Sequence, residues 1–174
     1  MPFTPFHLGP GLFFEMIFLK YLDFFAFLLG NVILDIEPFF VVLYNFKYPY
    51  RSYPHHAFFH TILGAFLVSV LTAIILDEFQ QKIQKAALKH LPSEFEKILS
   101  NTSSFPKIFF SVFLGTLLHL LFDSFMHYDV LPFWPFHFNP LLRLISPLQN
   151  YLLCIIFGIL GIVLFVLNLK KKIP

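Results

Sequence analysis

The residues best suited to chemistry lie in the segment 119–129, which contains His119, Asp123, His127 and Asp129. On an α-helix, His119, Asp123 and His127 at positions i, i+4 and i+8 share one face. The segment ends an apolar run, and ionisable side chains at membrane depth are costly and are usually paired or functional. Imidazole and carboxylate groups on one helix face predict a metal site.

A second histidine group, formed by His55, His56 and His60, opens another apolar run. His56 and His60 also have the i, i+4 spacing, so we favour His56 over His55 as the inward-facing residue. Two carboxylates, Asp35 and Glu37, stand in apolar surroundings further upstream. We expect the two histidine groups to meet, with these carboxylates beside them.

The composition is that of a membrane protein. The 174 residues are 57% hydrophobic and 13% charged, with 27 phenylalanines, whereas soluble domains contain about 25% charged residues. The net charge of +2 gives no argument for nucleic acid as a partner. The single cysteine, Cys154, excludes both an intramolecular disulfide and a cysteine-based metal motif.

The pattern predicts an all-α fold, a small polytopic membrane helical bundle that forms one integral-membrane domain over residues 1–174. Residues 57–76, 108–126 and 151–169 are apolar enough to span a membrane, because about 20 helical residues cover a hydrocarbon core of about 30 Å. Residues 11–29 carry Glu15, Lys20 and Asp23, which predicts an embedded or re-entrant helical segment. Residues 39–56 are interpreted as an interfacial loop, with a boundary at Pro38.

Lysine and arginine counts predict the orientation in the plasma membrane. Residues 77–107, interpreted as a polar helical loop, carry five lysines, and the C-terminal tail carries three more. The other side has only Lys47, Arg51 and Arg143. The positive-inside rule therefore places the polar loop and the C-terminus in the cytoplasm.

This topology brings both histidine groups to the outer leaflet. At 1.5 Å per residue, His60 lies about 5 Å below the outer boundary, and His119 and Asp123 lie about 13 and 8 Å below it. His7 reaches the same place only if the first segment turns back, and we expect that turn near Lys20 to Asp23. A straight crossing would leave His7 about 28 Å away.

Such a ligand set suits one or two divalent ions, Zn²⁺ first and Mn²⁺ or Fe²⁺ as alternatives. We divide the candidate residues into metal ligands and a second set, the catalytic or outer groups, which would move a proton or support the ligands. The metal ligands are His7, Asp35, His56, His60, His119 and Asp123, and the catalytic or outer groups are Glu37, His127 and Asp129. For His90 and His137 a local hydrogen-bonding role is the better interpretation.

Four stretches together resemble a prokaryotic family of predicted membrane-bound, metal-dependent hydrolases. They are Thr4 to His7, Gly30 to Pro38, His56 to Thr61, and Gly115 to Asp129 followed by Pro132 and Trp134-Pro135. The family has a glycine where this chain has Ala57, and one histidine where it has His55 and His56. The His-x-x-x-Asp spacing is also similar to that of the helical zinc-dependent phospholipase C and nuclease fold.

The resemblance implies a hydrolase, and the depth of the site favours an ester or phosphoester of a lipid or lipid-linked substrate. Two alternatives stay open: a divalent-metal transporter or metal-binding protein without catalysis, and a structural protein whose histidines only pair with carboxylates. Span 57–76 has no ionisable residue below His60, and span 108–126 has none before His119, which disfavours permeation. The oligomeric state is open.

Overall fold

The computed structural model describes residues 4–48, 53–89 and 103–171, and these residues form helices and connecting loops without any strand. The helices are η1 (Thr4–His7), α1 (Leu8–Phe18), α2 (Phe24–Ile33), α3 (Ile36–Lys47), η2 (Phe58–His60), α4 (Ile62–Leu88), α6 (Phe105–Ser124) and α7 (Pro147–Lys171). The predicted all-α membrane bundle is confirmed. The part of the predicted polar loop at residues 90–102 lies outside the described residues.

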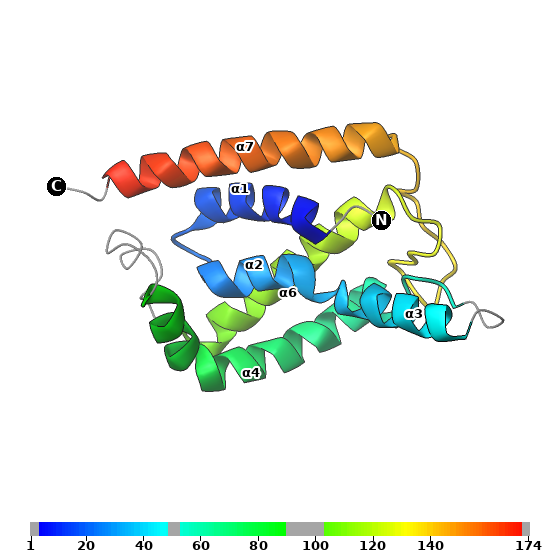
Figure 1. The fold of residues 1–174 in the computed structure, drawn as a ribbon, viewed down its shortest axis with the longest axis horizontal. Coiled ribbons are helices and arrows are strands. Elements are labelled where there is room, and N and C mark those ends of the chain that lie inside the picture. The colour runs from blue at the N-terminus through cyan, green and yellow to red at the C-terminus, as the bar shows by residue number, and fades with distance from the viewer. Residues whose placement is uncertain (1–3, 49–52, 90–102, 172–174) are drawn as a thin grey trace.

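The helices form stacked layers in which α7 lies over α1 and α1 lies over α2 (Figure 1). Helix α6 crosses behind α2 and also packs against α4. Four helical stretches are long and apolar enough to cross a membrane: Phe24–Lys47, Ile62–Gln80, Phe105–Ser124 and Pro147–Lys170. The sequence predicted three clear spans with slightly different bounds. The fourth, Phe24–Lys47, joins residues 24–29 at the end of the predicted re-entrant segment to part of the stretch 39–56 that was interpreted as a loop.

The first segment turns back, as predicted. α1 ends at Phe18, and α2 begins at Phe24 with Asp23 as its N-cap, whose Oδ1 accepts a hydrogen bond from the Ala26 N–H at 2.9 Å. The Oδ2 atom of Asp23 accepts a hydrogen bond from the Ser103 hydroxyl at 2.7 Å. The polar residues at this turn therefore serve to end one helix and start the next.

The interpretation of residues 39–56 as a loop is wrong up to Lys47, because α3 covers Ile36–Lys47. Pro38 is the third residue of α3, and proline is tolerated in the first helical turn, where backbone N–H groups have no intrahelical acceptor. The predicted span 57–76 also begins later. Thr61 has extended backbone angles and its Oγ1 accepts from the Gly64 N–H at 2.9 Å, which makes it the N-cap of α4.

Two glycines bring the backbones of α2 and α6 into direct contact. A Cβ at Gly30 would lie 2.3 Å from the Val112 carbonyl oxygen, and one at Gly115 would lie 2.4 Å from the Phe27 carbonyl oxygen. Both obstacles are backbone atoms, so a side chain at either position would push the helices apart. Asn31 follows Gly30, and His119 lies one turn after Gly115, so this contact sets the distance between them.

The C-terminal end of α6 is held by side chains from the following loop and from α7. The Nδ2 group of Asn139 donates to the Ser124 carbonyl at 3.0 Å, and the Nδ2 group of Asn150 donates to the Phe122 carbonyl at 3.0 Å. The last carbonyls of a helix lack intrahelical donors, so a buried helix end needs such partners. These bonds fix the last turn of α6, which carries Asp123.

We predict that Gly115→Ala destabilises the protein by about 1–3 kcal/mol, because the new methyl group overpacks the contact between α2 and α6. Gly158→Ala is the matched control, since a Cβ there would lie 3.5 Å from the Gly9 Cα, an ordinary van der Waals contact. The measurement is the midpoint of thermal unfolding in detergent. Equal midpoints for the two variants would contradict this account of the contact.

Candidate metal centre

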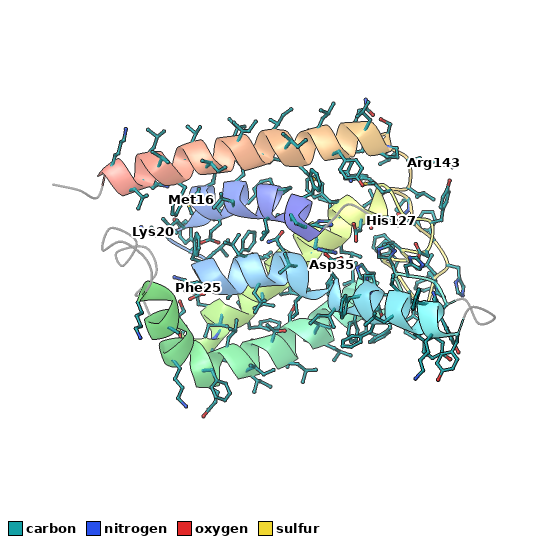
Figure 2. The ribbon with its side chains drawn as sticks, in the orientation of Figure 1. Met16, Lys20, Phe25, Asp35, His127 and Arg143 are labelled. Atoms are coloured by element: carbon teal, nitrogen blue, oxygen red, sulfur yellow. The ribbon has the colours of Figure 1, made fainter. Side chains whose placement is uncertain are left out.

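Three elements from distant parts of the chain meet at one end of the bundle. The last two turns of α6 supply His119 and Asp123. The junction of α2 and α3 supplies Asp35 and Glu37, and η2 supplies His60. Figure 2 shows Asp35 and His127 together at this end, with Met16 and Lys20 at the other. The two histidine groups therefore meet.

Asp123, which is 1% exposed, lies at the centre of the cluster. Its Oδ2 is 3.1 Å from His119 Nε2 and 3.5 Å from His60 Nε2, and the His56 Nε2 atom lies 3.8 Å away. Its Oδ1 is 3.2 Å from His7 Nε2 and 3.9 Å from His127 Nε2. Five imidazole rings therefore direct the same ring nitrogen at one buried carboxylate.

His7 reaches the cluster because η1 leads directly into α1 and α1 turns back at its far end. The ring of His7 stacks on the ring of His119, with centroids 3.9 Å apart. His127 reaches the cluster by a different route from the one predicted. The helix ends at Ser124, and a turn in which the Asp123 carbonyl accepts from the His127 N–H at 3.0 Å brings His127 back towards Asp123.

The opposite nitrogen, Nδ1, has a hydrogen-bond acceptor in three of these rings. The Nδ1 of His119 lies 2.8 Å from the Asn31 carbonyl oxygen. The Nδ1 of His60 lies 2.9 Å from Glu37 Oε2, and the Nδ1 of His56 lies 3.1 Å from Asp129 Oδ1. A carbonyl oxygen only accepts, so Nδ1 of His119 carries the hydrogen and Nε2 keeps its lone pair in the neutral ring. The two carboxylates favour the same tautomer in His60 and His56.

The donor atoms of this arrangement could hold a metal ion. The Nε2 atoms of His60 and His119 and the Oδ1 of Asp123 are buried and have no hydrogen-bond partner among the described residues. A lone pair that faces a carboxylate at 3.1–3.5 Å is repelled by it unless a proton on the ring or a metal ion lies between the two groups. Four tetrahedral ligands at 2.0–2.1 Å from Zn²⁺ would lie about 3.3 Å apart. The observed spacings are close to that value.

The ligand atoms fall into two groups whose members lie within 4.8 Å of one another. One group is Asp35, His60, His119 and Asp123, and the other is His56, His127 and Asp129. In the first group, His119 Nε2 lies 3.7 Å from Asp35 Oδ1. In the second, Asp129 is 31% exposed and His127 is 14% exposed, so this side is the more open one.

Glu37 holds the chain segment that carries His60. Its Oε2 accepts from the Ala57 N–H at 2.9 Å, and its Oε1 accepts from the Phe59 N–H at 3.0 Å. The same carboxylate contacts the His60 ring, so both of its oxygens are engaged. Glu37 therefore contacts and orients a histidine, which is one of the roles that the sequence left open for it as a catalytic or outer group.

Two groups on the open side have shifted pKa values. Desolvation lowers the pKa of His127 to about 4, so its ring is neutral at pH 7. Burial alone would raise the pKa of Asp129, but hydrogen bonds from the ring and backbone of His56 outweigh it and hold that pKa below its usual range. Asp129 is therefore ionised and accepts from the His56 N–H at 2.9 Å.

His55 and His137 do not take part in the cluster. His55 and His137 are exposed, in contrast to the buried His56, and His90 lies outside the described residues. Sequence reasoning missed Asn31, because it acts through its backbone carbonyl, which every residue type has. It also gave no role to Glu15, which is 0% exposed and whose two carboxylate oxygens have no hydrogen-bond partner within the described part of the chain.

The fold and the site define a multi-pass helical membrane protein with a buried histidine–carboxylate cluster at one end. Residues 7–172 match the model of the family described as YdjM inner membrane protein, and the chain belongs to that family. No curated protein and no solved structure matches the chain.

We predict that His119→Ala and Asp123→Ala remove bound metal from the purified protein. Glu37→Gln should weaken metal binding by about 10- to 100-fold, because it loosens a ring that ligates the ion. The measurement is metal content per chain by elemental analysis, with weak binding followed by titration. His55→Ala is the matched control, since His55 is exposed beside the buried His56. Unchanged metal content in His119→Ala would contradict the assignment.

Proposed function

We propose that the protein is an integral-membrane, metal-dependent hydrolase that cleaves an ester or phosphoester of a lipid or lipid-linked substrate. The observation that carries the proposal is the convergence of imidazole Nε2 atoms on Asp123, with the Nδ1 atoms of His56, His60 and His119 bonded to acceptors. Metal-binding histidines in proteins commonly have this arrangement.

Zn²⁺ is the proposed ion, with Mn²⁺ or Fe²⁺ as alternatives, because the donors are nitrogen and oxygen atoms. Asp35, His60, His119 and Asp123 would hold one ion, and His56, His127 and Asp129 would hold a second one. His7 contacts Asp123 Oδ1 and would complete the set on the buried side. A bound divalent ion lowers the pKa of a water ligand to about 7, which supplies a nucleophile at neutral pH.

The protein's own residues would orient the reactants and move the proton. Glu37 and Asp129 fix the rings of His60 and His56, so the Nε2 atoms of these rings stay aimed at the cluster. Where only the first ion is bound, Asp129 and His127 would be the groups on the open side placed to accept a proton from the attacking water.

The surroundings of the open side support a substrate that is presented by a membrane. The loop after His127 exposes Phe133, Trp134, Phe136 and Phe138, with 43, 43, 73 and 59% of their surface accessible. Aromatic side chains of this kind favour the interface between head groups and hydrocarbon. A lipid head group would lie at the same level as the cluster.

A transporter is the second candidate, and one observation favours it. Glu15 and Asn31 are fully buried along α1 and α2, and Asp23 lies at the far turn of α2, so polar groups extend along the bundle beyond the cluster. Ionisable groups lie at one end only in the predicted spans 57–76 and 108–126, but Glu15 and Asp23 lie outside these spans. Such buried groups can line an ion path.

We predict that the purified, Zn²⁺-loaded protein releases product from radiolabelled phosphatidylglycerol or phosphatidylethanolamine in mixed micelles. His119→Ala should lose this activity, because it removes a ligand, and His137→Ala in the exposed loop should retain it. Thin-layer chromatography measures the products. Failure of the wild-type protein to release product from either lipid, together with Zn²⁺ uptake into proteoliposomes, would replace the hydrolase by the transporter.

We propose that the cluster faces the outside of the cell and that the C-terminus is cytoplasmic, because eight lysines lie in residues 77–107 and the tail. In a Cys154→Ser background, Tyr128→Cys should react with an impermeant maleimide in intact cells, since Tyr128 is 65% exposed beside the cluster. Lys170→Cys should react only after lysis. The reverse pattern of labelling would overturn this orientation.

A further inference from the structure

An apolar groove lies between α1 and α6, on the side of the cluster that faces the centre of the bundle. Its volume is about 450 Å³, within the range of small-molecule sites. Phe14 and Phe18 of α1 and Leu114 and Leu118 of α6 form its long walls. Residues at the α1–α2 turn and on α2 complete it, namely Tyr21, Leu22 and Phe27.

The groove opens towards the bilayer. Phe18, Tyr21 and Leu114 at its rim are 45, 69 and 45% exposed, whereas Leu22 and Phe27 at its base are 8 and 3% exposed. α1 packs mainly on α7 and α2, so its face towards α6 has little protein cover. In a multi-pass membrane protein the medium outside such a rim is lipid hydrocarbon.

Both long walls of the groove belong to chain segments that also carry residues of the cluster. On α1, Phe14 and Phe18 stand seven and eleven residues after His7, which places all three on one helix face. On α6, Leu118 precedes His119, and Phe122 continues the row formed by Leu114 and Leu118 towards Asp123. Phe122 packs against Phe157 of α7 at a centroid distance of 6.3 Å.

The distance from the cluster to the far end of the groove matches one leaflet. From His7 to Phe18 the helical rise is about 16 Å, and half of a hydrocarbon core of about 30 Å is about 15 Å. A lipid whose head group lies at the cluster would therefore extend one chain along the groove to about the middle of the bilayer.

We propose that this groove binds one acyl chain of a glycerophospholipid whose head group lies at the histidine–carboxylate cluster. The assignment of the head group rests on the proposed function, whereas occupation of the groove by an acyl chain does not. The groove would then select lipids with long chains, and soluble esters or phosphoesters of the same chemistry would bind weakly.

The test uses the full-length protein in vesicles that contain phosphatidylcholine with a photoactivatable diazirine on one acyl chain. Mass spectrometry of peptides should locate the cross-links at residues 14–22 and 114–118. Leu118→Trp fills the groove and should reduce these cross-links about tenfold, the effect of displacing about two buried methylene groups. Leu121→Trp is the matched control on α6, where Leu121 is 40% exposed and does not line the groove.

Leu114→Trp at the exposed rim provides a second variant. Unchanged metal content and a single size-exclusion peak would show that each variant is folded. Cross-links spread evenly over the outer faces of α4, α6 and α7 would mean ordinary boundary lipid and would overturn the proposal. Cross-links unaffected by either groove variant would overturn it as well.

The His119→Ala variant separates this proposal from the proposed hydrolase. Retained cross-links at the groove in this variant would support chain binding independently of metal and catalysis. Lipid hydrolysis by the wild-type protein without cross-links at the groove would overturn the groove while leaving the hydrolase in place.

Discussion

The carboxylate of Asp123 is buried inside this membrane protein and lies within 3.9 Å of an Nε2 atom from each of five histidines. Three of these rings are bonded through Nδ1 to the Asn31 carbonyl, Glu37 and Asp129. Each of these bonds keeps a lone pair directed at the same small volume. Without a metal ion or a proton shared by these groups, the lone pairs and the carboxylate would repel each other at low dielectric. The rest of the structure serves to hold this arrangement.

The elements that hold the rings differ from those that supply them. His119 comes from α6, but its Nδ1 acceptor comes from α2, at a distance set by the contact between Gly30 and Gly115. His60 comes from η2, but Glu37 of α3 binds it together with the N–H groups of Ala57 and Phe59. A small change in helix packing would therefore move a ring relative to its acceptor. This explains why close backbone contact is needed far from any ligand.

The sequence was sufficient to predict the cluster and the class of fold. The i, i+4 spacing of His119 with Asp123, and the position of His60 near the start of a span, predicted a common depth that the structure reproduces through their contact. The turn after α1 followed from the need to bring His7 to the cluster. The turn could be placed near Lys20 to Asp23 because ionisable side chains are costly in the hydrocarbon core.

Other features could not be predicted because they depend on tertiary position. Pro38 indicated a boundary, yet it sits in the first turn of α3, where a missing N–H costs nothing. Thr61 caps α4 only because Phe58 to His60 form a separate turn. The roles of Asn31 and Glu37 lie in a carbonyl and in two accepted N–H bonds. Residue type alone contains neither kind of information.

The most direct test of a metal centre built around Asp123 is an anomalous-difference map of the protein purified without chelator. The account predicts an anomalous peak between Asp123 and the Nε2 atoms of His60 and His119, with nitrogen and oxygen ligands only. An occupied metal site elsewhere, or no peak at Asp123 after soaking with Zn²⁺, would contradict it.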